Sequence, residues 1–322
     1  MDKATIPDHL YDIVIVGGGP AGLTAGIYTT RASLRTLLIE GASSVSQIVV
    51  TDIIENYPGM PEGIGGFELI GRFKKQALQF GLEISSEDVI RIAKTHWGNT
   101  EVWRVTSAGR DYEALAVIVA TGAYWRKLGV RGEDALIGKG VSYCATCDGP
   151  IYKNRDVVVV GGGDAAVKEA IFLTKFARKV TIVHRRKRLR AVKVLEKRAL
   201  ANSKIEFAWN SVVEEITGRN VVEKVKIKDV DSPDIRREIP AQGVFIFVGL
   251  TPKTDIVRGI VDVDDGGYII VDADMQTSVK GIFAGGDCTR KGLRQIITAC
   301  GDGATAAASA QHYVEELKGE SY

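Results

Sequence analysis

The sequence predicts an α/β fold with two parallel-sheet modules, one of which is divided in the chain by the other. Three observations support this expectation. A strand, a glycine-rich turn, a helix and a second strand follow one another from residue 11, and the same order returns from residue 155. Two later apolar runs, 116–120 and 243–248, end beside Gly122 and Gly249. Because such units form parallel sheets with helices on their faces, two copies in 322 residues indicate two domains.

The first unit places the sequence Gly17–Gly22 between an apolar run, residues 11–16, and a helical stretch, residues 23–32. Its next strand, residues 36–39, is followed directly by Glu40. This is the Gly-x-Gly-x-x-Gly pattern of a Rossmann-like dinucleotide-binding domain in its full context. The N-terminus of the helix favours an anionic pyrophosphate, and Glu40 can accept hydrogen bonds from ribose hydroxyls.

Each glycine of the pattern has a separate task. Gly17 permits a tight turn, Gly19 lets the backbone approach a pyrophosphate, and Gly22 lets the helix pack closely on the strand. The remaining positions of this turn include Pro20 and Ala21.

The second unit repeats this order with a strand at 155–160, the turn Gly161–Ala166, a helix at 167–176 and a strand at 180–183. Its turn includes Gly163, Asp164 and Ala165. Where the first unit has Glu40, the second has basic residues, namely His184, Arg185, Arg186 and Arg190.

Guanidinium groups pair with a 2′-phosphate through bidentate hydrogen bonds, whereas a carboxylate repels it. The second unit is therefore predicted to bind NADP(H), and the first a ribose with free hydroxyls. The alternative is that the basic run is a solvated start of a helix, an interpretation that suits Lys187 and Arg188.

The matching strand ends place the crossings between domains near Gly122 and Gly249. One domain then comprises residues 1–122 and 249–322, and the inserted domain comprises residues 123–248. Further elements expected are helices at 67–80 and 297–317, and strands at 102–106 and within 281–287.

The sequence Cys144-Ala-Thr-Cys147-Asp148-Gly149 is expected in a loop or a first helical turn. Two thiols separated by two residues can close a disulfide and reopen on accepting two electrons. Half of a metal site and two buried small residues are the alternatives. Only Cys288 and Cys300 remain, and they do not form a second such pair, so no metal site is predicted and these two thiols are expected in the core.

Composition sets limits on function. The formal net charge of +2 gives no basic field for nucleic acid, and no apolar run approaches the length of a membrane helix. The first twelve residues are polar and unlike a signal peptide. The expectation is a soluble, cytoplasmic protein with no membrane partner.

Together these motifs resemble the low-molecular-weight thioredoxin reductases, a flavoprotein family, over essentially the whole chain. The resemblance implies FAD in the divided domain, NADPH in the inserted domain and a homodimer. It rests on Gly17–Gly22, residues 55–59, Ala120–Gly122, Cys144–Gly149, Gly161–Ala166, His184–Arg190, Gly286-Asp287 and Arg294–Ile296.

The same resemblance implies residue roles. Cys147 is similar to the thiol beside the flavin, Cys144 to the thiol that attacks the partner disulfide, and Asp148 to a proton-transfer residue, with a turn-forming Asp-Gly as the alternative. The expected FAD ligands are Gly17, Gly19, Pro20, Ala21, Gly22, Glu40, Gln47, Asn56, Thr121, Gly286, Asp287, Arg294, Gln295 and Ile296. The expected NADPH ligands are Gly161, Gly163, Asp164, Ala165, His184, Arg185, Arg186 and Arg190.

The reaction that follows is NADPH-dependent reduction of FAD, then of the Cys144–Cys147 disulfide, then of thioredoxin or a thioredoxin-like protein. We also expect residues 123–248 to rotate about the two crossings. The alternatives are an NAD(P)H oxidase that passes electrons to oxygen or peroxide, the flavin reductase of a peroxide-recycling system, and a redox sensor without turnover.

Overall fold

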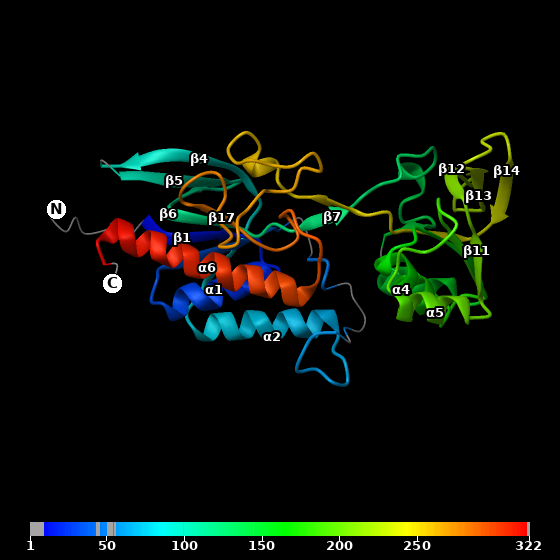
Figure 1. Cartoon of the computed structure of the whole chain (residues 1–322), viewed down its shortest axis with the longest axis horizontal. Coiled ribbons are helices and arrows are strands. Elements are labelled where there is room, and N and C mark those ends of the chain that lie inside the picture. Colours follow the sequence, from blue (N-terminus) through cyan, green and yellow to red (C-terminus); the bar gives the residue numbers. More distant parts are fainter. Residues whose placement is uncertain are drawn as a thin grey trace. The chain divides into compact units, whose positions relative to one another are not determined.

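A computed structural model describes residues 10–42, 46–49, 54, 56–98, 100–143 and 145–320, except for the side chains of Thr146 and Cys147. The chain folds into two compact units. Unit 1 comprises Met1–Tyr124 and Thr251–Tyr322, and unit 2 comprises Trp125–Leu250 (Figure 1). Within the described part of the chain, none of the helices combines the length and apolar composition needed to cross a membrane.

Unit 1 is built on a mixed seven-stranded sheet in the order β3-β2-β1-β6-β5-β4, with β17 paired to β6. The pairs among β1, β2, β3, β6 and β17 are parallel, whereas β4, β5 and β6 form an antiparallel meander. The bounds are β1 (Leu10–Val16), β2 (Thr36–Glu40), β3 (Glu83–Ser86), β4 (Val89–Trp97), β5 (Thr100–Ser107), β6 (Asp111–Val119) and β17 (Ile282–Ala284).

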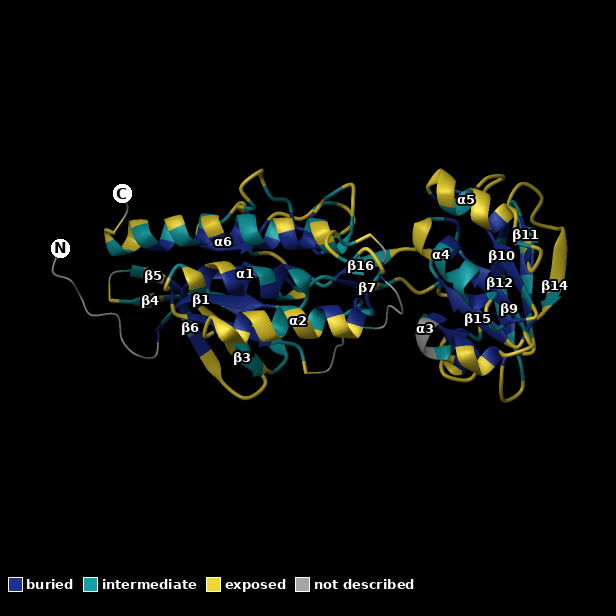
Figure 2. Ribbon diagram, turned by 90° about the horizontal axis from the view of Figure 1, so that it is seen from below, coloured by how far each residue is buried: buried dark blue, intermediate teal, exposed yellow. Residues whose placement is uncertain are grey.

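Helices α1 (Pro20–Arg31), α2 (Gly66–Gln79) and α6 (Ile296–Lys318) lie on one face of this sheet (Figure 1). The buried residues of α6 form a stripe towards α1 (Figure 2). Side chains of β1 alternate between two cores because successive residues of a strand face opposite ways. Ile13 and Ile15 pack with the helices, whereas Val14 and Val16 pack with the residues that cover the other face.

Unit 2 has a fully parallel five-stranded sheet in the order β11-β10-β9-β15-β8. Val157 and Val159 of its central strand face the core formed with helix α4, whereas Val158 and Val160 face the core formed with an antiparallel three-stranded sheet. The bounds are β8 (Val141–Ser142), β9 (Asp156–Val160), β10 (Lys179–Val183), β11 (Ile205–Ala208), β15 (Gly243–Ile246), α3 (Ala145–Asp148), α4 (Asp164–Leu173), α5 (Lys193–Leu200), β12 (Ser211–Thr217), β13 (Lys224–Asp229) and β14 (Arg236–Pro240).

The chain passes between the units through β7 (Ala123–Trp125) and β16 (Leu250–Pro252), which pair with each other. Gly122 and Gly249 precede these two strands with φ values of 70° and 128°. Such angles favour glycine, since side chains with a Cβ are rarely found there.

Most predicted elements are present, with small shifts at their ends. Helices α1 and α4 begin about one turn earlier than the apolar pattern indicated, at Pro20 and Asp164, because the last residues of each glycine turn are already helical. Strand β4 and the sheet β12-β13-β14 were not predicted.

Candidate functional site

The first glycine turn connects β1 to α1 and leaves no room for side chains at two of the three glycines of the Gly-x-Gly-x-x-Gly pattern. Gly17 has φ 120°, and a Cβ there would lie 2.2 Å from the carbonyl oxygen of Ala120. A Cβ on Gly22 would lie 1.8 Å from the Gly17 oxygen. By contrast, the nearest atom to a Cβ on Gly19 is the Ser46 hydroxyl at 3.6 Å. The tight turn and close packing predicted for Gly17 and Gly22 are thus present, and the space beside Gly19 is open.

Glu40 ends β2 beside this turn. Its Oε1 accepts hydrogen bonds from Lys74 Nζ and Ser86 Oγ, both at 2.8 Å. Burial acts to raise the pKa of Glu40, but these two bonds prevail and lower it, so the carboxylate is charged at neutral pH. A Cβ on Gly18 would lie 2.7 Å from Glu40 Cβ and 3.1 Å from Oε2. No described residue hydrogen-bonds Oε2, which leaves that oxygen for a ligand.

Side chains of the segments expected beside the flavin bond to residues distant in the sequence. Gln295 is the N-cap of α6, and its Oε1 accepts a hydrogen bond of 2.7 Å from Asn56 Nδ2. Gln47 Nε2 donates to the Ala123 carbonyl at 2.6 Å, and Thr121 Oγ1 donates to the Lys253 carbonyl. The structure therefore brings Asn56 and Gln295 into direct contact although 239 positions separate them.

Asp287 follows β17 and has a buried oxygen, Oδ1, with no hydrogen-bond partner among the described residues. Burial raises the pKa of this carboxyl, although Lys291 and Arg294 oppose the rise. Arg294 likewise has a buried Nε without a partner, and its guanidinium lies 4.0 Å from the centre of the Tyr268 ring. Buried polar atoms in native proteins are nearly always bonded, so orphaned ones at a predicted ligand site indicate missing ligand atoms.

The second glycine turn repeats the geometry of the first. Gly161 has φ 143°, and a Cβ there would lie 2.3 Å from the Phe247 carbonyl oxygen. The Ala120 carbonyl oxygen occupies the same place relative to Gly17. No atom of the described residues lies within 4 Å of a Cβ position on Gly163, so the space beside it is open. Asp164 begins α4, and its Oδ1 accepts a hydrogen bond of 2.7 Å from the Val192 backbone. The carboxylate therefore ties this turn to the start of α5.

The arginine loop, residues 184–190, follows β10 next to this turn. His184 is buried, and a Cβ on Gly162 would lie 2.4 Å from its ring. Burial lowers the pKa of His184, with a smaller lowering from Arg190, Arg186 and Arg185, so the ring is neutral at pH 7. Its Nε2 is buried and has no hydrogen-bond partner in the part of the chain that the structure describes. The three arginines are exposed, and none forms an ion pair with a described residue. They are free to bind an anion.

Cys144 lies outside the described residues. Cys147 belongs to the short helix α3, and Asp148 ends that helix with a partly buried side chain. Ala145 is 1% exposed, and Gly149 is buried against Leu173 of α4. The described part of the motif thus forms a short helical turn within unit 2 and packs on α4.

Comparison with known proteins gives one consistent result. Residues 11–303 match the family model described as pyridine nucleotide-disulphide oxidoreductase. A thioredoxin reductase of Listeria monocytogenes is 48% identical, over 97% of this chain and 96% of its own. A thioredoxin reductase of Bacillus subtilis is 46% identical over 97% of each chain. The crystal structure of Lactococcus lactis thioredoxin reductase is 42% identical with a TM-score of 0.90, over 95% of this chain and all of that one.

The chain belongs to the pyridine nucleotide-disulphide oxidoreductase family. It has the two Rossmann-type domains of its relatives, and its cofactors are FAD and NADPH. Both fit the observed geometry. The open space at Gly19, the free oxygen of Glu40 and the orphaned oxygen of Asp287 suit FAD in unit 1. The open space at Gly163, the orphaned His184 nitrogen and the unpaired arginines suit NADPH in unit 2.

Several residues at these family sites were missed by sequence reasoning. Asp302 of α6 accepts hydrogen bonds from the Gly286 backbone at 2.8 Å and from Lys291, and so holds the turn before Asp287. Lys74 holds Glu40. Gly303 is required because a Cβ there would lie 2.1 Å from the Ala21 oxygen of α1. Each contact joins segments distant in the sequence, and no local pattern indicates it.

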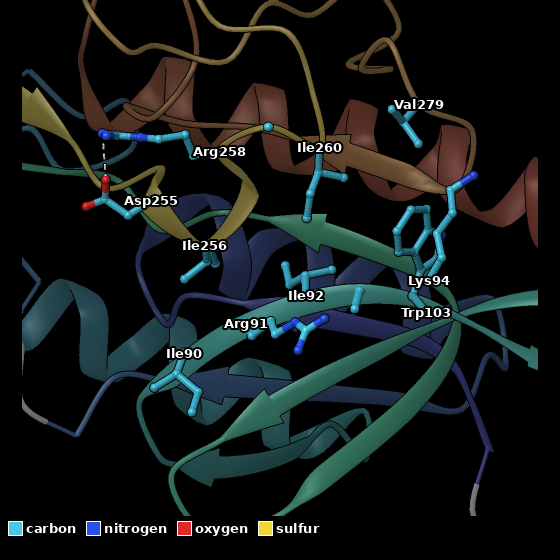
Figure 3. Close-up of a pocket in the computed structure, with 12 residues that line it drawn as sticks. Ile90, Arg91, Ile92, Lys94, Trp103, Asp255, Ile256, Arg258, Ile260 and Val279 are labelled. Atoms are coloured by element: carbon cyan, nitrogen blue, oxygen red, sulfur yellow. Dashed lines mark ion pairs between the residues drawn. The ribbon is translucent and has the colours of Figure 1, made fainter.

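A separate pocket in this oxidoreductase lies in unit 1 between β4 and residues 255–260 (Figure 3). Its volume is about 570 Å³, and none of the predicted site residues lines it. Lys94 and Arg258 at its rim pair with Glu101 and Asp255. The pocket is therefore distinct from both nucleotide turns.

Proposed function

We propose that this chain is an NADPH-dependent thioredoxin reductase. The observation that carries the proposal is the pair of glycine turns with opposite ribose chemistry, a free carboxylate oxygen beside one and unpaired guanidinium groups beside the other. These turns occur in one chain with a Cys-x-x-Cys sequence, and relatives named thioredoxin reductase match nearly the full length. Such a chain has a site for each component of an electron path from NADPH to a disulfide.

Unit 1, Met1–Tyr124 and Thr251–Tyr322, is proposed as the FAD domain. Its Gly17–Gly22 turn would hold the pyrophosphate against the N-terminus of α1, and Glu40 would bind the adenosine ribose. The Asp287 carboxylate would bind on the ribityl and pyrophosphate side. The start of α6 would lie at the flavin edge, where the positive end of the helix dipole favours negative charge. The remaining proposed FAD ligands are Gln47, Asn56, Thr121, Gly286, Arg294, Gln295 and Ile296.

Unit 2, Trp125–Leu250, is proposed as the NADPH domain. The turn at Gly161–Ala165 would hold the pyrophosphate of NADPH, and Arg185, Arg186 and Arg190 would bind the 2′-phosphate. Neutral His184 would hydrogen-bond the ligand through Nε2, which has no hydrogen-bond partner among the described residues. Each charge-assisted hydrogen bond contributes about 1.5–3 kcal/mol, which is enough to separate NADPH from NADH.

Cys144 and Cys147 are proposed as the redox pair. FAD, when bound, supplies a group that accepts a hydride and passes two electrons to sulfur. Cys147 would be the thiol on the flavin side and Cys144 the thiol that forms the mixed disulfide with thioredoxin. Asp148, at the end of α3, would transfer the proton that accompanies thiol release.

The test is a thioredoxin-coupled assay of the purified, FAD-loaded protein. We expect NADPH oxidation to require thioredoxin and a final disulfide acceptor, and to be abolished in Cys144→Ser and Cys147→Ser. Cys300→Ala is the matched control, because Cys300 is a buried free thiol whose pKa is raised by burial. Full thioredoxin-independent NADPH oxidation in both redox variants would instead identify an NAD(P)H oxidase.

The proposal also covers the oligomeric state and the cellular compartment. We propose that the enzyme is a homodimer and acts in the cytoplasm, where reducing conditions keep a catalytic dithiol available. Light scattering at assay concentrations tests the oligomeric state: a mass of about one chain would contradict the dimer. Fractionation of cells tests the compartment.

A further inference from the structure

Glu133 is a buried carboxylate that belongs to neither nucleotide turn. Its side chain is 1% exposed and lies in unit 2, at the start of a 3₁₀ turn, Asp134–Leu136. Oε1 accepts hydrogen bonds from the Leu128 backbone at 2.9 Å and from the Tyr143 hydroxyl at 2.5 Å. Oε2 accepts one of 2.6 Å from the Gly129 backbone. Both oxygens are therefore satisfied, as a buried carboxylate requires.

Tyr143 is the residue immediately before Cys144. Burial raises the pKa of the Tyr143 phenol, and its hydrogen bond to Glu133 raises it further, so the hydroxyl remains a donor throughout the neutral range. The bond is charge-assisted and only partly exposed to water, and such bonds are stronger than those between neutral groups.

The backbone on either side of the Cys-x-x-Cys sequence is also held. Val141 and Ser142 pair with Val244 and Phe245 at the edge of the parallel sheet. After the motif, a Cβ on Gly149 would lie 3.2 Å from Leu173, so this segment is packed directly on α4. The strand pairing covers only two residues, and the Tyr143–Glu133 hydrogen bond is a side-chain contact that adds to it.

We propose that Glu133 and Tyr143 are positioning residues for the redox pair, and this inference rests on the proposed function. By fixing the side chain of residue 143, they restrict the backbone that leads into Cys144. Fewer conformations of the open dithiol raise the effective concentration of one thiol towards the other. The bond therefore favours the disulfide over the dithiol. Loss of the bond should make the pair easier to reduce.

The experiment compares Tyr143→Phe with the wild type, both full-length and FAD-loaded, at equilibrium with reduced and oxidised glutathione. After rapid alkylation, the mass of the peptide that contains residues 144 and 147 reports the fraction in the disulfide form. We expect the equilibrium constant for disulfide formation to fall at least about threefold, equivalent to about 14 mV for a two-electron couple. A merely structural role would not change this constant.

Tyr112→Phe is the matched control. Tyr112 donates a hydrogen bond of 2.6 Å to Glu87 in unit 1, so the variant loses the same chemistry away from the motif. Glu133→Gln, where it folds, should shift the equilibrium in the same direction as Tyr143→Phe. Values for Tyr143→Phe equal to those of wild type and Tyr112→Phe would overturn the proposal.

The glutathione equilibrium needs no thioredoxin, so the two proposals fail separately. A wild-type protein that forms the disulfide but does not reduce thioredoxin would refute the proposed function, and the Tyr143→Phe shift would still support the positioning role. Thioredoxin reduction with no shift in Tyr143→Phe would leave the proposed function intact and refute the positioning role.

Discussion

Asp287 illustrates at the level of one residue how a ligand site lowers the stability of the protein without its ligand. Its Oδ1 is buried and has no hydrogen-bond partner among the residues described by the structure, and burial raises the pKa of the carboxyl. In FAD-free protein, Asp287→Asn should therefore increase the free energy of unfolding at pH 7 by on the order of 1 kcal/mol, because a buried charge is removed. The same variant should bind FAD more weakly, since a carboxylate acceptor is lost.

The sign of the pH dependence follows from the raised pKa. Below the ordinary value of 3.8 the carboxyl is protonated in both the folded and unfolded states, so the variant and the wild type should differ little. The increase in the free energy of unfolding caused by Asp287→Asn should develop as the pH rises from 3.8 through the raised pKa of the carboxyl in the folded state. Thermal unfolding at several pH values measures it, with exposed Asp265→Asn as the control. A less stable FAD-free variant would contradict the interpretation.

Arg185 and Arg186 should decide between NADPH and NADH. The double variant Arg185→Ala/Arg186→Ala should raise the KM for NADPH at least about tenfold, since each lost charge-assisted bond is worth about 1.5–3 kcal/mol, and should leave the KM for NADH nearly unchanged. Lys187→Ala is the control in the same loop, because Lys187 pairs with Asp231 at 3.5 Å. Equal effects on both nucleotides would show that these arginines do not bind the 2′-phosphate.

At this scale, the sequence indicated residues whose chemistry is local. Gly17, Gly161 and Glu40 follow strands at fixed spacing, so their geometry could be predicted. Lys74 and Asp302 could not, because each acts on a partner from a different segment. Pairing across such distances depends on how helices pack on the sheet, and no spacing in the sequence encodes it.

At the level of elements, the packing of α6 on α1 connects the stability of unit 1 to its cofactor site. A Cβ on Gly303 would lie 2.1 Å from the Ala21 carbonyl oxygen, within the turn proposed for FAD. Gly303→Ala should therefore push the two helices apart, destabilise the protein by about 1–3 kcal/mol and weaken FAD retention.

Gly301→Ala is the matched control, two positions away in the same helix. Among the residues that the structure describes, none has an atom within 4 Å of a Cβ position on Gly301. Alanine favours helix over glycine by about 1 kcal/mol, so this variant should be slightly more stable than the wild type. Chemical denaturation and FAD absorbance after gel filtration distinguish the two variants. Similar behaviour of both would refute the close helix contact.

The elements that could be predicted are those with an uninterrupted apolar pattern. Strands β1 and β9 are buried on both faces and read as continuous apolar runs, and α6 reads as a long alanine-rich helix. The sheet β12-β13-β14 carries many charged residues that pair across its exposed face, such as Lys226 with Glu215 at 2.7 Å. The alternation of apolar and polar residues in these strands is therefore weak, and the formation of this sheet depends on the hydrophobic core beneath it.

At the level of the whole molecule, the two units build a nucleotide turn in the same way. Each contains a set of parallel strands with helices on one face and other segments on the opposite face. Each nucleotide turn begins with a glycine that lies against the backbone just after a neighbouring strand. The difference between them is chain continuity. Unit 1 is closed by segments from both ends of the chain, whereas unit 2 is a single uninterrupted segment.

Unit 2 should therefore fold as an isolated fragment, residues 125–250. It contains two hydrophobic cores, one on each face of its parallel sheet, and their buried residues all lie within the fragment. All residues proposed for the 2′-phosphate also lie within it. We expect the fragment to unfold cooperatively and to bind 2′,5′-ADP within roughly threefold of the affinity of the full-length protein, because domains with their own core generally fold alone. Calorimetry measures both properties. A folded fragment that fails to bind 2′,5′-ADP, when the full-length protein binds it, would show that unit 1 contributes to the NADPH site.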